Sequence, residues 1–348
     1  MTDLPLTPRT WLIFTTSHAA EDGRLQRHLI LIESGGDFAE IISHREPRRA
    51  VRFATAPFKL WSALRVRRPD IVVLPDPELW SLGPLIARLS GIKAVVDVHE
   101  NYASVAADDQ RFHRRGASLA AKAVVLFEKL GRRTAHVTIV AAPELAHGFD
   151  VTLRNLPLVG MSTPELSQSS TRMVYVGDVS ESRGIWEMLH LVEGSPEMTL
   201  DLVGPIPPEL RSRVSHWITE HKLTEQVTIH GRLGYANSWD IARGATVGLA
   251  LLRPTPAYVE ATPTKIWEYM AAGIPVLATA LPPAKRLLEQ AACGIVADGV
   301  DAQCQAIDEL RKNRQVFAAN GLRHASTFSE ETDAAWVEIV SRLRCGGT

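Results

Sequence analysis

Short apolar segments rich in β-branched residues alternate with amphipathic helical stretches throughout the chain. Parallel strands need a crossover connection, usually a helix, so this alternation predicts parallel sheets covered by helices. In the first half, strands are expected at residues 11–15, 38–42, 71–74, 94–98 and 137–140. In the second half, they are expected at residues 173–176, 199–203, 227–230, 247–252, 275–278 and 294–297. The expected fold class is α/β, with two doubly wound, Rossmann-like halves.

The length of 348 residues suits two domains, at roughly 150 residues per domain. Residues 156–171 lose all periodicity and gain Pro, Ser and Gly, which is typical of a linker. We therefore expect an N-terminal domain at 1–155 and a C-terminal domain at 172–328. A final helix is expected at 329–343, because a serine and two glutamates form its first turn.

The composition, with 45% hydrophobic and 22% charged residues, is that of a globular protein and disfavours disorder or a coiled coil. The uncharged run at 269–284 contains three prolines, so it does not predict a membrane span. The N-terminus lacks the basic and apolar regions of a signal peptide, and the three cysteines form no C-x-x-C motif. A cytoplasmic location is expected.

Charge is distributed unevenly. Residues 1–155 hold 21 Lys and Arg against 17 Asp and Glu, whereas the remainder holds 17 against 22. The arginines gather in two runs, from Arg45 to Arg68 and from Arg111 to Arg133. These runs are either solvated helix faces or contacts for an anionic partner, such as phospholipid headgroups or a polyprenyl phosphate. Nucleic acid is disfavoured as a partner, because no aromatic residues interleave the runs for stacking.

Ligands of an open parallel sheet bind outside the carboxyl ends of the strands. The segment after the first expected strand, TTSHAAEDGRL, contains a single glycine, and no G-x-G-x-x-G motif precedes a helix. This argues against a nicotinamide or flavin domain. The lysine motif of P-loop ATPases is absent as well.

The segment YVEATPTKIWEYMAAGIPVLAT, residues 258–279, contains a lysine where a helix is expected to begin. Pro263 suits the start of a helix, but Lys265 in the first turn opposes the helix dipole at a cost of about 0.3–1 kcal/mol unless an anion binds there. Lys265 is therefore either a surface lysine or a phosphate ligand. Glu260 and Glu268, with seven residues between them, either face one ligand or are solvated acids.

Two further segments follow expected strands. In YVGDVSESRGIWEML, residues 175–189, backbone amides and Arg183 could grip a diphosphate, although a structural role for Arg183 stays open. In VVDVHENY, His99 follows a strand and is either a buried structural histidine or a sugar contact. No H-E-x-x-H spacing surrounds it, so no metal site is expected.

Taken together, these segments resemble a known family. PTKIWEYMAAGIPV with Glu260 is similar to the E-x7-E region of retaining GT-B glycosyltransferases of the family 4 type. YVGDVSESRG resembles that family's strand and diphosphate loop, DLVGP its next strand, and VTIHGRL its base-binding strand. SHAAEDGRL, PDPELW and DVHENY in the N-terminal half resemble a bacterial subgroup. The motifs occur in the expected order over nearly the whole chain.

The resemblance implies roles for individual residues. Arg183 and Lys265 would hold the donor diphosphate, Glu268 the ribose hydroxyls and Glu260 the transferred sugar, with His99 beneath the reacting sugar; Glu260 and His99 would be the catalytic residues. The donor site would also include Thr264, Gly177, Gly231 and Arg232, the last two through the backbone at the nucleobase. The acceptor side would comprise His18, Asp22, Arg24, Asp76, Glu78 and Glu100.

The chain departs from the family pattern at two places. Many relatives carry a second basic residue just after the strand glycine, where this chain has Asp178 after Gly177, so the diphosphate contacts are expected to differ. The glycine-rich first loop is replaced by Ser17 and His18, so the contacts made by that loop are expected to differ too.

The implied architecture is GT-B, two facing Rossmann-like domains with an inter-domain cleft, and a terminal segment, 329–348, that packs back on the N-terminal domain. The implied reaction is retaining transfer of a sugar from a nucleotide-diphosphate donor to an acceptor hydroxyl, in cell-surface polysaccharide or glycolipid synthesis, without metal or other cofactor. The acceptor would be a glycan or lipid-linked, with peripheral contact to an anionic membrane. A nucleotide-sugar epimerase of the same fold and a catalytically silent GT-B subunit are the alternatives.

Overall fold

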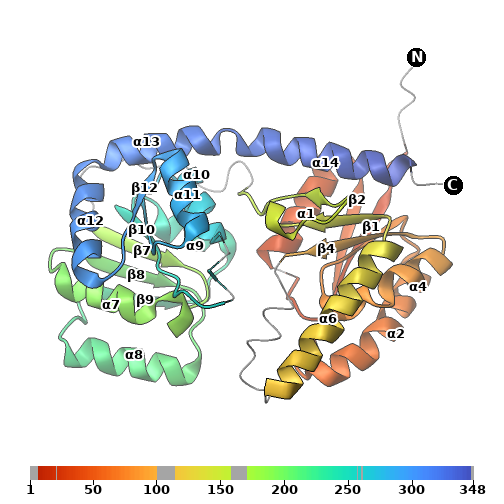
Figure 1. The fold of residues 1–348 in the computed structure, drawn as a ribbon, viewed down its shortest axis with the longest axis horizontal. Helices are drawn as coiled ribbons and strands as arrows, with labels where there is room; N and C mark the ends of the chain where they lie inside the picture. The colour runs from red at the N-terminus through yellow and green to blue at the C-terminus, as the bar shows by residue number, and fades with distance from the viewer. Residues whose placement is uncertain are drawn as a thin grey trace. The chain divides into compact units, whose positions relative to one another are not determined.

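A computed structural model of the chain describes residues 7–20, 22–99, 114–157, 171–256, 258–259 and 262–345. Its contacts divide the chain into two compact units (Figure 1). Unit 1 comprises Met1–Asn155 and Glu330–Thr348, and unit 2 comprises Leu156–Ser329. Within the described residues, no helix combines the length and apolarity needed to cross a bilayer. Glu100 and Glu260, both expected in the site, lie outside the described residues.

Unit 1 contains a six-stranded parallel sheet with the order β2-β1-β3-β4-β5-β6. Its strands are β1 (Thr10–Thr15), β2 (Phe38–Ser43), β3 (Ile71–Leu74), β4 (Lys93–Val98), β5 (Val137–Val140) and β6 (Val151–Thr152). The described helices are α1 (Gly23–Ser34), α2 (Arg49–Arg67), α3 (Pro77–Trp80), α4 (Gly83–Leu89), α6 (Arg114–Thr134) and the 3-10 turn η1 (Pro143–Leu145). β3 and β5 are buried at every residue, as expected for strands covered on both faces. The two-residue strand β6 is too short to show a sequence pattern, and it was not expected.

Unit 2 contains a second six-stranded parallel sheet with the order β12-β11-β10-β7-β8-β9. Its strands are β7 (Arg172–Val176), β8 (Thr199–Val203), β9 (Val227–Gly231), β10 (Val247–Ala250), β11 (Val276–Ala278) and β12 (Gly294–Val296). Its helical segments are η2 (Glu181–Arg183), α7 (Ile185–Gly194), α8 (Pro208–Glu220), α9 (Tyr235–Ala242), α10 (Thr264–Ala271), α11 (Pro282–Ala291), α12 (Val300–Lys312) and α13 (Arg314–Ala325). Two apolar clusters fill its core.

The α/β class with two doubly wound halves is confirmed. β10 ends two residues before the expected position, because its ladder with β11 stops at the Ala250–Ala278 pair. Pro263 lies just before α10 rather than within its first turn. Leu156, expected in the linker, is buried in the core of unit 2.

The last helix, α14 (Phe328–Cys345), begins and ends slightly outside the expected range. In unit 1 its Trp336 ring lies 5.5 Å from the ring of Trp11. Thr332 accepts a 3.4 Å hydrogen bond from Arg27, and the Leu343 carbonyl accepts one from Lys93. The segment after residue 329 therefore completes unit 1.

Candidate functional site

The strand orders locate a switch point in each sheet. In unit 1 the order reverses between β1 and β3, and in unit 2 it reverses between β7 and β10. Loops that follow such strands diverge and leave a crevice at the carboxyl edge of the sheet, where ligands of doubly wound proteins bind. The loops concerned begin at residues 16, 75, 177 and 251. They contain most of the residues selected from the sequence, in two clusters described separately below.

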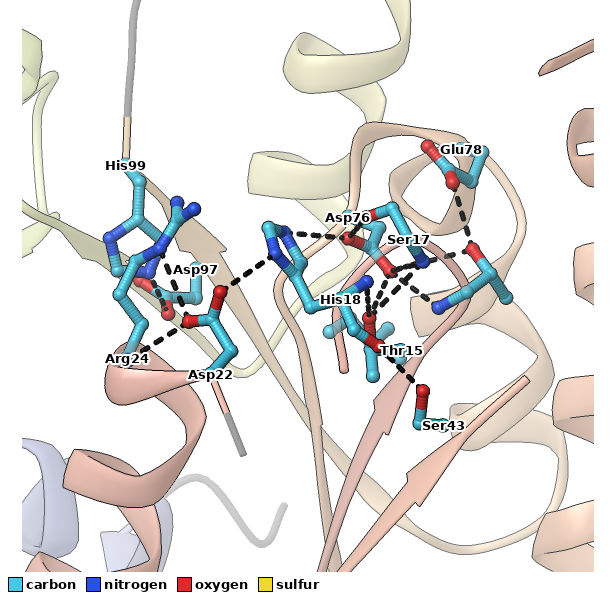
Figure 2. Close-up of polar contacts among 12 residues, drawn as sticks. Thr15, Ser17, His18, Asp22, Arg24, Ser43, Asp76, Glu78, Asp97 and His99 are labelled. Atoms are coloured by element: carbon cyan, nitrogen blue, oxygen red, sulfur yellow. Dashed lines mark hydrogen bonds and ion pairs between the residues drawn. The ribbon is translucent and has the colours of Figure 1, made fainter. Parts of the chain in front are cut away.

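In unit 1, Asp76 organises the loop after β1 (Figure 2). Its buried carboxylate accepts hydrogen bonds from the Thr15 hydroxyl at 2.8 Å and the Thr16 backbone N–H at 2.6 Å, and another from the Ser17 hydroxyl. Buried polar groups need such partners, so Asp76 is required for the conformation of this loop. The loop in turn positions His18 at the carboxyl edge of the sheet.

The His18 ring lies between two carboxylates. Its Nε2 is 3.3 Å from Oδ1 of Asp76, and its Nδ1 is 3.3 Å from Oδ2 of Asp22. Asp22 caps α1 by accepting from the backbone N–H of Arg24 at 3.0 Å. Burial acts to raise the pKa of Asp22, but the His18 hydrogen bond and the Arg24 charge hold it well below its usual range. The structure thus brings together His18, Asp22, Arg24 and Asp76.

Glu78 lies in the same cluster but faces α2. It is buried, accepts from the Thr16 hydroxyl at 2.8 Å and forms an ion pair with Arg52. Burial and the neighbouring charge of Asp76 raise the pKa of Glu78. Arg52, taken from the sequence as part of a basic run, is therefore committed to this carboxylate.

His28, Asp97 and His99 form a second cluster of unit 1, a triad at the carboxyl end of β4. Nε2 of His28 and Nε2 of His99 lie 2.6 and 2.5 Å from the same oxygen of Asp97, while Asn155 Nδ2 lies 3.0 Å from His99 Nδ1 (Figure 2 shows the Asp97–His99 contact). Burial acts to raise the pKa of Asp97, but the two imidazoles hold it far below its usual range. Burial lowers the pKa of His99 despite the adjacent Asp97.

A neutral His99 ring fits these contacts, with Nε2–H donating to Asp97 and Nδ1 accepting from the Asn155 amide. The ligand atoms of His28, Asp97 and His99 lie within 4.8 Å of one another, a set that could hold a metal ion and that the sequence analysis did not anticipate. Their mutual hydrogen bonds already account for the close approach of the three side chains. His28 was missed because a helical residue 69 positions before Asp97 gives no local signal.

In unit 2, Lys265 and Gly177 meet at the end of β7. Lys265 lies in the first turn of α10, and a Cβ built on Gly177 would come within 2.5 Å of the lysine Cε and Nζ. Gly177 has a φ of +138°, which favours glycine. The ammonium also lies 5.3 Å from the centroid of the Tyr175 ring. Glycine at this position therefore leaves the space that Lys265 needs over the end of the strand.

Arg183 reaches the same place from η2. Its Nε donates to the Tyr258 hydroxyl at 3.5 Å, and Gly184, with φ +83°, links η2 to the first residue of α7. Burial and the charge of Arg183 lower the pKa of Lys265 to about 8. Within the described parts of the chain, neither cation has a carboxylate within 4.0 Å. Two neighbouring cations that form no ion pair among the described residues are suited to bind an anion.

Glu268 lies one turn after Lys265 on α10. The Tyr235 hydroxyl donates to its Oε1 at 3.3 Å, and burial raises the pKa of Glu268 to about 7 against the opposing effects of Lys265 and Tyr235. Asp178 also acts on Lys265 electrostatically, so the residue that departs from the family pattern lies close to the cations.

The remaining candidates lie at the edge of this cluster. Thr264 is exposed at the first position of α10. Gly231 ends β9 with φ +74°, and its carbonyl accepts from the Gly204 N–H at 2.8 Å. Arg232 is exposed, and the described residues give its side chain no hydrogen bond or ion pair. The structure therefore joins Gly177, Arg183, Lys265 and Glu268, but not Arg232.

Comparisons with known proteins give one family match and several structures of similar fold. Residues 164–324 match the sequence family described as "Glycosyl transferases group 1". No curated protein sequence matches the chain. Among solved structures, sucrose-phosphate synthase (tll1590) from Thermosynechococcus elongatus is similar, with a TM-score of 0.76 and 15% identity over 97% of this chain and 98% of that chain.

Two further structures are similar. Anabaena Alr3699/HepE in complex with UDP-glucose has a TM-score of 0.69 and 14% identity over 95% of this chain and 99% of that chain. WaaG, a glycosyltransferase involved in lipopolysaccharide biosynthesis, has a TM-score of 0.64 and 15% identity over 94% and 98%. The two doubly wound units have the GT-B fold of these structures and, with the family match over residues 164–324, they identify the protein as a glycosyltransferase.

Proposed function

We propose that this glycosyltransferase transfers a sugar from a nucleotide-diphosphate donor to an acceptor hydroxyl, with retention at the anomeric carbon. One observation carries the proposal: Lys265 packs against Gly177 at the switch point of unit 2 and feels the charge of Arg183, and neither cation has a carboxylate within 4.0 Å in the described residues. The bound UDP-glucose of the similar HepE structure supports a nucleotide-sugar donor.

Cleavage of the donor C–O bond passes through an oxocarbenium-like state while negative charge grows on the leaving phosphate. Arg183, Lys265 and the backbone N–H groups that begin α10 would stabilise that charge. These fixed positive groups would take the place of a divalent metal, so we propose a reaction without metal or other cofactor. A bound diphosphate would also keep Lys265 protonated.

Further roles follow the resemblance. Glu268 would bind the ribose hydroxyls, Glu260 the hydroxyls of the transferred sugar, and His99 would lie beneath that sugar. No side chain is assigned as a covalent nucleophile. Retention would arise by same-face attack: the acceptor oxygen bonds to the anomeric carbon as the bond to the phosphate oxygen breaks, and that phosphate oxygen accepts the acceptor's proton.

The test starts with the pure protein and a panel of nucleotide sugars, to find the donor that it hydrolyses slowly. Arg183→Ala and Lys265→Ala should each lower donor use about 10- to 150-fold, because a charge-assisted contact contributes roughly 1.5–3 kcal/mol. Lys285→Ala and Arg286→Ala, exposed on α11, are the matched controls and should leave donor use unchanged.

Near-normal turnover in both site variants would refute the assigned diphosphate site. Conversion of a nucleotide sugar to its epimer without an acceptor would refute transfer and favour the epimerase. Binding of a donor without hydrolysis, epimerisation or transfer to any acceptor would favour the silent subunit.

We also propose that the acceptor is a glycan or lipid-linked glycan made for the cell surface, and that unit 1 contacts an anionic membrane through exposed basic residues. Arg45 and Arg48 are exposed, whereas Arg52 is paired with Glu78 and is left out. Vesicle co-sedimentation should be salt-sensitive and weaken in Arg45→Gln/Arg48→Gln. Activity on a soluble acceptor with no vesicle binding would refute the membrane contact.

A further inference from the structure

A cavity of about 720 Å³ lies in unit 1 at the opposite edge of the sheet from the candidate site. It is lined by Arg9 just before β1, Asp70 just before β3 and Lys93 at the start of β4, which are amino ends of strands. The chemistry assigned above lies at the carboxyl ends. The cavity is therefore separate from the transfer site, and its volume is in the range of small-ligand sites.

Five cations line this cavity, together with one carboxylate, Asp70. The cations are Arg9, Arg65, Arg68, Lys93 and Arg344. Arg9 forms an ion pair with Asp37, whose Oδ2 accepts from two guanidinium nitrogens, and Asp70 accepts from the Thr10 backbone N–H and hydroxyl. The other four cations have no carboxylate within 4.0 Å among the described residues.

The negative ends of nearby helices balance only part of this positive charge. The carboxyl ends of α2, α4 and α14 contribute lining residues, and each such end carries about half a negative charge (Figure 1 labels the three helices). Three ends together amount to roughly 1.5 negative charges. Lys93 donates to the Leu343 carbonyl of α14, so it acts as a cap for one of them. Four cations against three helix ends and the Asp70 carboxylate leave an excess of roughly 1.5 positive charges, close to the charge of a phosphate group at neutral pH.

The cavity is also lined by apolar side chains, which a ligand would have to cover. Leu64, Ile71 and Ile92 are buried in the floor. Leu89 is 81% exposed and Trp61 47% exposed beside them, with the Arg65 guanidinium 4.5 Å from the Trp61 ring. An inorganic ion alone would leave both of these side chains in water. A ligand with an anionic phosphate group and an apolar or flat organic part would cover them.

We propose that this cavity is a second anion site, which binds the phosphate group of an amphiphilic or aromatic ligand. Arg65, Arg68 and Arg344 supply the guanidinium groups, and Trp61 and Leu89 contact the organic part. The phosphate comes either from a soluble organophosphate or from a lipid headgroup, since both present the same charge.

Calorimetry with inorganic pyrophosphate counts the sites. The wild-type protein should bind two equivalents, one at Arg183 and Lys265 and one at the cavity. Arg65→Gln/Arg68→Gln/Arg344→Gln should bind one equivalent, and a chain that also carries Lys265→Ala should bind none. Arg88→Gln/Lys285→Gln/Arg286→Gln removes three exposed cations that line neither site and should keep both equivalents. Circular dichroism checks that each variant is folded.

The source of the phosphate is determined in two further arms. Phenyl phosphate should bind the cavity at least tenfold more tightly than inorganic phosphate if the organic part contacts Trp61. If the source is a lipid, the cavity variant, Arg65→Gln/Arg68→Gln/Arg344→Gln, should bind vesicles of phosphatidylglycerol in phosphatidylcholine at least tenfold more weakly than the wild type does. One pyrophosphate equivalent in the wild type that survives in the cavity variant, with unchanged vesicle binding, overturns the proposal. The transfer site is expected to bind its own equivalent of pyrophosphate, at Arg183 and Lys265. If only that equivalent is missing, the result counts against the proposed function and not against the cavity.

Discussion

Replacement of Asp76 by alanine should destabilise unit 1 far more than replacement of another carboxylate with similar contacts. Asp76 is fully buried and accepts from the Thr16 backbone N–H, the Thr15 hydroxyl and the Ser17 hydroxyl. A buried donor left without a partner costs about 1–3 kcal/mol. The Thr16 N–H cannot rotate toward water, whereas the hydroxyls can partly recover, so we expect a loss of about 2–5 kcal/mol.

Asp70 is the matched control. It also accepts from a backbone N–H, at 2.8 Å, and from a threonine hydroxyl, at 3.0 Å, but both donors belong to Thr10 and both contacts are exposed. Water replaces the lost acceptor there, so Asp70→Ala should cost less than about 1 kcal/mol. Asp76→Asn should fall between the two, because the amide oxygen still accepts from Thr16 but the NH₂ group cannot accept from Ser17.

The assay is urea unfolding of the full chain, with hydrogen exchange of the peptide spanning β1 and the following loop as a local measure. Asp76→Ala should lower the midpoint and speed exchange at Thr16, while exchange in unit 2 stays unchanged. If Asp76→Ala costs no more than Asp70→Ala, the loop does not depend on this carboxylate and the argument fails.

Three other outcomes are expected. Gly177→Ala places a Cβ against the Lys265 ammonium and should weaken binding of a free nucleoside diphosphate at least tenfold in calorimetry; unchanged affinity would mean that the lysine binds elsewhere. The pKa of Lys265 is lowered to about 8 by burial and Arg183, and a bound diphosphate favours the charged form, so diphosphate affinity should fall as pH rises above about 8; in Lys265→Arg this fall should disappear, and its persistence would assign it to another group. In Asp97→Asn the new amide NH₂ group should donate to His99 Nε2 and reverse the imidazole tautomer, which should lower turnover about 10- to 100-fold at constant diphosphate affinity. Unshifted nitrogen NMR signals of the His99 ring would contradict this.

Much of the fold could be predicted because its signals are local. Strands such as β3 and β5 are continuous Val and Ile runs, which is what burial on both faces of a parallel sheet requires. Lys265 could also be selected from the sequence, since a cation in the first turn of a helix is unfavourable unless an anion binds there. The structure adds the close fit against Gly177, which no spacing rule contains.

Other parts of the site depend on contacts between distant segments. Arg52 looked like one more member of a basic run, but packing of α2 brings it to the buried Glu78. His28 lies inside α1, and Asn155 lies 56 positions after His99, yet both contact the triad. Charge or helical periodicity does not distinguish such residues from surface residues, because the partner is set by tertiary packing.

The contribution of α14 to unit 1 has a consequence for biosynthesis. Arg27 and its partner Thr332 are separated by 305 residues, and the whole of unit 2 is translated between them. Domains of a growing chain fold in the order in which they are completed. Unit 2 is continuous and is completed first, although the larger segment of unit 1, Met1–Asn155, leaves the ribosome earlier. Until α14 is made, Trp11 lacks the Trp336 ring. A chain that ends after Ser329 should therefore contain a folded unit 2 and an incomplete unit 1 that chaperones recognise.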